Sequence, residues 1–99
     1  MQFVVTAMDY TDPDAMTRRM ANREAHLAGV RELIANGHLL SGGAILDDQG
    51  RMIGSTMHLD FPDRASLDRT LQNDPYVTGK VWDKIDIRLA RIVPQSRPN

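Results

Sequence analysis

The chain has 99 residues and a formal net charge of −1, with 12 basic and 13 acidic residues that are interspersed along it. This balance argues against a protein that grips nucleic acid through a basic stripe, and the absence of cysteine excludes disulfides, thiolate nucleophiles and Cys-ligated zinc. The length suits one domain, which we expect over residues 1–93, followed by a polar tail over residues 94–99.

Hydrophobic segments in this sequence are short. None approaches the roughly 18 apolar residues of a membrane-spanning helix. Residues 1–10 lack the basic start of a signal peptide and are typical of a strand instead. We therefore expect a cytoplasmic protein whose partners include neither a membrane nor a nucleic acid.

The first expected elements are a strand and a long helix. β-Branched and aromatic residues dominate residues 2–8, which predicts a strand. The TDPD sequence that follows predicts a helix start, with Thr11 or Asp12 as the cap and the proline in the first turn. Asn36-Gly37 predicts the end of this helix.

Rotation by about 100° per residue predicts which face of the helix is buried. The expected buried stripe consists of Met16, Met20, Leu27, Val30 and Ile34. Arg23 falls close to the centre of that stripe, whereas Arg19 and His26 lie to one side of it. The helix is therefore expected to carry a polar border that partly invades its apolar face.

Two strands joined by a hairpin are expected next. They cover residues 38–46 and 51–59, and the second strand is expected to turn Ile53, Ser55, Met57 and Leu59 toward the core. The glycine pair at 42–43 marks either a bulge or a place where a ligand approaches the backbone closely.

A second helix and a last strand complete the predicted order. Asp63 is the expected cap of this helix, and Leu67 and Leu71 form its buried side. Pro75 is expected to stop it, because the residue before a proline is pushed out of helical geometry. The last strand is expected within residues 82–93.

This β-α-β-β-α-β order predicts a ferredoxin-like α+β sandwich. Its simplest form is a four-stranded antiparallel sheet with both helices on one face. The opposite face is then uncovered, and a second copy of the chain is the simplest layer to cover it. We therefore expect a homodimer formed through the open sheet face.

Five short motifs along nearly the whole chain resemble the YciI-like (YCII-related domain) family of dimeric α+β barrel proteins. They are FVVTAMD in the first strand, Arg23-Glu24-Ala25-His26-Leu27, GHLLSGG at 37–43, GST at 54–56 and NDPYV at 73–77. The chain departs from some relatives at 35–38, where it has ANGH in place of a stretch with an acidic residue, and His38 replaces a basic residue. The resemblance implies a dimeric α+β barrel built from ferredoxin-like protomers.

The resemblance also implies that His26 and Asp74 form an acid–base pair. The family's proposed active site joins a histidine of the first helix to an aspartate that precedes a proline and an aromatic residue. A carboxylate bonded to one ring nitrogen fixes the tautomer of a histidine and stabilises its imidazolium form. The alternative interpretation is a structural pair at the border of the helix.

Arg23, the Ser41-Gly42-Gly43 segment and Tyr76 are the candidate substrate-binding groups. A guanidinium on an apolar stripe needs a carboxylate or a ligand anion, and a hydroxyl with open backbone N–H groups can bind an oxyanion. The alternatives are an Arg23 paired with a neighbouring acid such as Asp74 or Glu24, a bulge at the glycines, and a packing role for Tyr76.

No metal or cofactor is expected, because His38 and His58 lack acidic partners at ligand spacing. The sequence leaves two functions open. The first is a small cofactor-independent enzyme that uses His26 and Asp74 on a polar, anionic small molecule, in lyase, isomerase, dehalogenase or hydrolase chemistry. The alternative is a non-catalytic dimeric module that binds a metabolite or assists another protein.

Overall fold

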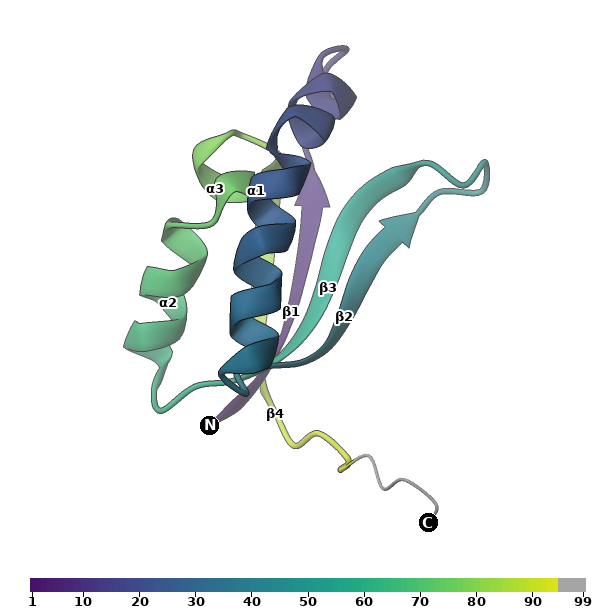
Figure 1. Ribbon diagram of the computed structural model, residues 1–99. Helices are drawn as coiled ribbons and strands as arrows, with labels where there is room; N and C mark the ends of the chain where they lie inside the picture. The colour runs from purple at the N-terminus through teal and green to yellow at the C-terminus, as the bar shows by residue number, and fades with distance from the viewer. Residues whose placement is uncertain (95–99) are drawn as a thin grey trace.

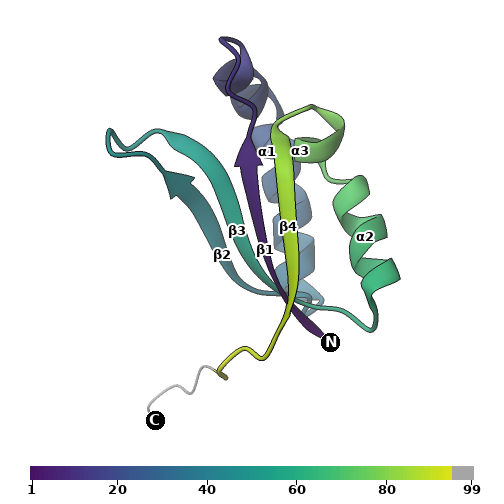
Figure 2. The same ribbon diagram turned by 180° about the vertical axis from the view of Figure 1, so that it is seen from behind.

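The computed structural model describes residues 1–94, and its four strands form one antiparallel sheet in the order β2-β3-β1-β4. The strands are β1 (Gln2–Asp9), β2 (Leu39–Leu46), β3 (Met52–Asp60) and β4 (Trp82–Ala90). The helices are α1 (Ala15–Ala35), α2 (Arg64–Gln72) and the short α3 (Pro75–Thr78), which lie together on one face of the sheet (Figure 1). Seen from behind, the other face carries no helix (Figure 2).

The predicted ferredoxin-like α+β sandwich is therefore confirmed. Most of the expected polar tail, residues 95–99, lies outside the described residues. Within residues 1–94, no helix is both long enough and apolar enough to cross a membrane.

Alternation along β1 and β3 builds the core. Phe3, Val5 and Ala7 of β1 are fully buried beneath the helices, because alternate residues of a strand share one face. On β3, the predicted inward residues Ser55, Met57 and Leu59 are buried, whereas Ile53 near the hairpin is half-buried. Leu67 and Leu71 of α2 pack against this layer, as predicted.

Helix boundaries follow local capping signals, with one correction at the start of α1. Asp63 caps α2 by accepting a 2.8 Å hydrogen bond from the Ser66 backbone N–H, as expected. Neither Thr11 nor Asp12 caps α1, because that helix begins only at Ala15. The Asp12 carboxylate instead accepts hydrogen bonds of 2.8 and 2.6 Å from the guanidinium of Arg18.

The predicted buried stripe of α1 is wrong in part. Met16, Met20 and Ile34 are exposed, and the buried residues of this helix are Ala15, Arg19 and His26. The helix is rotated so that the polar border faces the core, where polar partners from other elements receive Arg19 and His26. Leu27, Val30 and Ile34 of the predicted stripe border the space beside the β2–β3 hairpin, which curves away from α1 (Figure 1).

The end of the chain also differs from expectation. A single turn of helix, α3, follows α2 where the sequence predicted only a helix stop. Strand β4 ends at Ala90, within the expected range, and the side chain of Leu89 is 68% exposed. Because β4 is an edge strand of the sheet, the helical layer covers it incompletely: Trp82 at its start belongs to the core and Ile87 packs against it, but the end of the strand is exposed.

Candidate functional site

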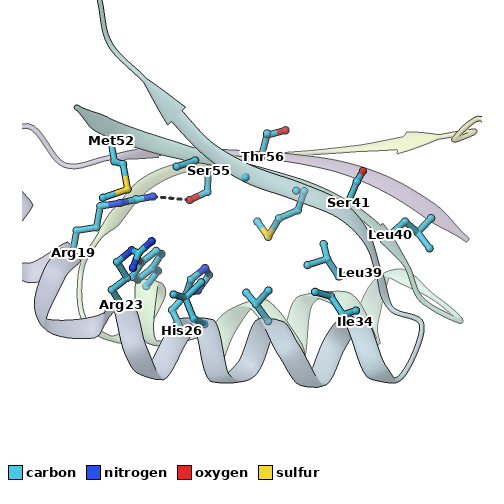
Figure 3. Close-up of a pocket in the computed structure, with 17 residues that line it drawn as sticks. Arg19, Arg23, His26, Ile34, Leu39, Leu40, Ser41, Met52, Ser55 and Thr56 are labelled. Carbon is cyan, nitrogen blue, oxygen red and sulfur yellow. Dashed lines mark hydrogen bonds between the residues drawn. The ribbon is translucent and has the colours of Figure 1, made fainter. Parts of the chain in front are cut away.

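A cleft of about 520 Å³ opens between α1 and the β2–β3 hairpin (Figure 3). Six of the seven residues singled out in the sequence border this cleft: Arg23, His26, Ser41, Gly42, Gly43 and Tyr76. The seventh, Asp74, lies directly behind His26. The structure thus brings the candidate residues together, while their roles remain predictions.

His26 is held by Asp74 at the inner wall of the cleft. Its Nδ1 lies 2.8 Å from Asp74 Oδ1, and both side chains are largely buried. A carboxylate only accepts hydrogen bonds, so the Nδ1–H of His26 is the donor in this contact and Asp74 is the acceptor. The other ring nitrogen, Nε2, has no protein partner within residues 1–94, and it is the nitrogen that a ligand in the cleft can reach.

The local sequence around Asp74 explains its position. Pro75 occupies the first turn of α3, and Asp74 before it has the extended backbone that a proline imposes. The same Oδ1 atom accepts a 2.8 Å hydrogen bond from the backbone N–H of Tyr76, so Asp74 is also the N-cap of α3. One carboxylate oxygen therefore fixes both the short helix and the histidine.

Tyr76 stacks on His26. The two ring centroids lie 3.8 Å apart at an interplanar angle of 7°, and the Arg19 guanidinium carbon lies 4.8 Å from the centroid of Tyr76. Positions 19 and 26 are two helical turns apart, roughly 10 Å along the axis, so the phenol ring lies between them. Burial raises the pKa of Tyr76, although the charges of Arg19 and Arg23 act in the opposite direction.

Arg19 is a site residue that the sequence interpretation left out. Its Nη1 donates 3.0 Å hydrogen bonds to both carboxylate oxygens of Asp9, and the two side chains are almost fully buried. Its Nη2 donates to the Gly54 carbonyl at 3.0 Å and to Ser55 Oγ at 3.2 Å. Burial raises the pKa of Asp9, and the positive charge of Arg19 opposes this effect.

A second buried donor completes this network. Trp82 Nε1 donates a 3.1 Å hydrogen bond to Ser55 Oγ, and its ring packs edge-to-face with His26 at a centroid distance of 5.6 Å. The only sequence signal for Arg19 was its place on the polar border of α1, because its partners come from strands distant in sequence. Arg19 and Trp82 therefore support the inner wall on which His26 and Tyr76 rest.

Arg23 stands at the mouth of the cleft. Its side chain is exposed rather than buried, which differs from the position expected near the centre of the apolar stripe. The alternative of an ion pair with Asp74 or Glu24 is not found within residues 1–94. Its guanidinium is thus the cationic group that the cleft presents to a ligand.

The Ser41 hydroxyl does not point into the cleft. Ser41 Oγ lies 2.9 Å from His58 Nδ1, and Figure 3 shows the side chains of Ser41 and Thr56 on the side of the sheet away from α1. A register shift between Leu39 and Ser41 places the bulge at Leu40, two positions before Gly42. The cleft is therefore bordered by the backbone of Ser41 and not by its hydroxyl.

The two glycines differ in their surroundings. A Cβ atom on Gly42 would lie 2.8 Å from the carbonyl oxygen of Thr56, whereas one on Gly43 would meet nothing within 4 Å. Gly42 thus permits close contact between neighbouring strands, while the space beside Gly43 is open.

Within residues 1–94, no group of three or more His, Asp or Glu residues is arranged to hold a metal ion.

The four-stranded sheet, the single helical layer and the cleft beside it define an α+β protein with a ferredoxin-like fold. The chain belongs to the YCII-related domain family, whose domain matches residues 1–90.

Relatives of similar length support this assignment. A protein of Haemophilus influenzae described as uncharacterized is 30% identical over 94 residues, covering 89% of this chain and 94% of its own length. The protein YciI of Escherichia coli is 29% identical, with the same coverage of both chains.

Solved structures show the same fold. The 5-chloro-2-hydroxyhydroquinone dehydrochlorinase TftG of Burkholderia phenoliruptrix, in complex with 2,5-dihydroxybenzoquinone, is similar with a TM-score of 0.80 and 23% identity over 92% of this chain and 94% of that chain. A conserved protein of Methanosarcina mazei is similar with a TM-score of 0.52 and 15% identity, over 92% of each chain.

Proposed function

We propose that this chain is a small enzyme that transfers a proton on a polar, anionic small molecule, with His26 as the acid–base group. The observation that carries the proposal is the orientation of the His26 ring. Asp74 occupies Nδ1 at 2.8 Å, which leaves Nε2 as the nitrogen available to a ligand in the cleft, and in a neutral ring with its proton on Nδ1 this nitrogen is the acceptor. A histidine in this state accepts a proton at Nε2, and the carboxylate stabilises the imidazolium that results.

Arg23 is proposed as the clamp for the substrate anion. It is the exposed guanidinium at the mouth of the cleft, one helical turn before His26. A guanidinium pairs with a carboxylate through two parallel hydrogen bonds. Gly42, Gly43 and the backbone of Ser41 border the cleft opposite α1, and Tyr76 forms the base beside His26.

Elimination, isomerisation, dehalogenation and hydrolysis all require a positioned proton acceptor, and the cleft geometry suits each of them. TftG is named as a dehydrochlorinase and was solved with 2,5-dihydroxybenzoquinone, which makes planar, acidic, oxygenated rings a sensible first group of test compounds. The homodimer through the open sheet face belongs to the same proposal, because that face has no covering layer of its own (Figure 2).

The test begins with a thermal-shift screen of anionic small molecules, including 2,5-dihydroxybenzoquinone, and continues with NMR turnover assays of every compound that binds. We expect wild type to convert at least one of them, and His26→Gln to bind the same compound without converting it. Conversion at the wild-type rate by His26→Gln would refute the proposal. Binding without conversion by wild type would favour the non-catalytic ligand-binding module instead.

A further inference from the structure

The cleft has two chemically different halves along α1. Its polar half is bordered by Arg19, Arg23 and His26, and the next three lining residues of the helix are Leu27, Val30 and Ile34. Positions 26 to 34 rise roughly 12 Å along a helix axis, so the apolar half is long compared with a small anionic head group.

The opposite wall is also apolar at this end of the cleft. Leu39, Leu40 and Met57 face the apolar half from β2 and β3, and Figure 3 shows Ile34, Leu39 and Leu40 together at the end of the cleft away from Arg19. Ile34 is 56% exposed and Leu40 is 44% exposed, so apolar surface remains open to a ligand there. Burial of such surface is favourable in proportion to the apolar area removed from water.

Charge is presented to the cleft at one end only. The buried cation Arg19 is neutralised by Asp9, and Asp74 lies behind His26 without lining the cleft. The exposed guanidinium of Arg23 therefore stands against an uncharged apolar half. This arrangement is complementary to a molecule with an anion at one end and a hydrocarbon body at the other.

We propose that the cleft binds amphiphilic monoanions, with a carboxylate or enolate head between Arg23 and His26 and an unbranched or aromatic apolar body along Leu27, Val30 and Ile34. This inference rests on the proposed function, because it takes the Arg23–His26 end as the site of the reacting head group. It adds that the length and apolarity of the body determine which anions bind.

The experiment measures the affinities of straight-chain alkanoates from butanoate to dodecanoate by isothermal titration calorimetry and NMR shift mapping. For each methylene that enters the apolar half, we expect affinity to rise by up to about fourfold, the ratio for full burial of one CH₂ group. Alcohols of the same chain lengths should bind more weakly throughout, because they lack the charge that pairs with Arg23.

Two matched variants locate the apolar body. Ile34 and Met20 are both exposed residues of α1, at 56% and 52%, but only Ile34 lines the cleft. We expect Ile34→Asn to reduce the gain in affinity for the longer acids while butanoate binding is retained. Met20→Asn should leave the whole series unchanged.

Arg23→Gln tests the contribution of the anionic head group to affinity separately from that of the apolar body. It should weaken every alkanoate by a similar factor and preserve the gain per methylene. Three results would each overturn the inference. Wild type could show no rise in affinity with chain length, Ile34→Asn could leave that rise intact, or no alkanoate could bind at millimolar concentration. A flat series combined with His26-dependent turnover of a short anion would overturn this inference alone and leave the proposed function standing.

Discussion

The carboxylate of Asp74 lies 2.8 Å from Nδ1 of His26 although 48 positions separate the two residues in the chain. The contact depends on α3, because the same oxygen caps that helix through the Tyr76 N–H. Tyr76 in turn stacks on the imidazole at a centroid distance of 3.8 Å. The orientation of His26 and the presence of α3 are therefore linked through one aspartate.

Asp74→Asn and Asp74→Ala separate the capping contribution from the charge. Asparagine caps helices about as well as aspartate, so Asp74→Asn should retain the fold, whereas Asp74→Ala should lose about 1 kcal/mol of unfolding free energy from the cap alone. Chemical denaturation measures this difference. Both variants lose the carboxylate, and we expect ¹⁵N NMR to show His26 no longer confined to the tautomer with the proton on Nδ1.

If Asp74→Ala is as stable as wild type and keeps a single His26 tautomer, Asp74 does not hold the ring. Asp68→Asn, at an exposed carboxylate of α2 that pairs with Arg64, is a control that should leave the His26 spectrum unchanged.

Arg19→Met should strongly destabilise the fold at neutral pH. It leaves the Asp9 carboxylate buried without its cation, a change that costs about 3–5 kcal/mol in buried ion pairs. Urea denaturation measures this loss. Asp9→Asn combined with Arg19→Met should recover much of it, because no unpaired buried charge remains.

The Arg19→Met effect should also depend on pH. Burial already raises the pKa of Asp9 above its ordinary value, and Arg19 opposes that rise. Without Arg19, protonated Asp9 is favoured further in the folded state, so the destabilisation grows as pH rises from about 4 through the folded pKa. A loss of stability that is equal near pH 4 and near pH 7 would contradict this account.

The glycine pair of β2 offers a matched comparison. A methyl group on Gly42 would lie 2.8 Å from the Thr56 carbonyl oxygen, so Gly42→Ala should destabilise the protein by about 1–3 kcal/mol. Gly43 has open space around its Cα and no positive φ, so Gly43→Ala should be neutral or stabilise by up to about 1 kcal/mol. Thermal denaturation distinguishes the two, and equal effects would mean that the strand adjusts around the added methyl group.

Acid stability should report the ion pair between Asp12 and Arg18. The hydrogen bond from Arg18 lowers the pKa of Asp12 to about 2 from its ordinary 3.8. Between these values the unfolded chain binds more protons than the folded one, so this stabilisation is present above about pH 4 and is lost as pH falls toward 2. The difference in melting temperature between wild type and Asp12→Asn should shrink over that range, whereas Asp48→Asn, at an exposed turn position, should show no such trend.

Local signals made most of the fold predictable from sequence. The alternation in β1 and β3, the Asp63 cap and the stop at Asn36-Gly37 each depend on residues close together in the chain, and the structure confirms them. A single-turn helix such as α3 is different. Asp74-Pro75 predicted the interruption of α2, but four residues carry too little periodicity to distinguish a turn from a helix.

The rotation of α1 was the part that the sequence could not determine. Periodicity located an apolar stripe and a polar border, but it could not tell which of them faced the sheet. That choice depends on Asp9 and Ser55, which receive Arg19, and on Asp74, which receives His26. A buried guanidinium is stable only where such partners converge, and convergence of distant segments is a property of the folded chain. The sequence also predicted that the Ser41 hydroxyl could bind a ligand in the cleft. The direction of this side chain depends on the register shift just before Ser41, which the sequence did not locate.

The open sheet face leads to the last prediction. Alternation along β1 and β3 places Val4, Thr6 and Thr56 on that face, which carries no helix (Figure 2), and they are only half-buried. If a second copy covers them, light scattering at micromolar concentration should give twice the 11.1 kDa mass of the chain. Val4→Arg should then yield a monomer, because it places a charge in the apolar part of the interface. Met20→Arg adds the same charge on α1, on the other side of the sheet, and should leave the dimer intact. A stable wild-type monomer, or a dimer that Val4→Arg leaves unchanged while Met20→Arg disrupts it, would place the interface elsewhere.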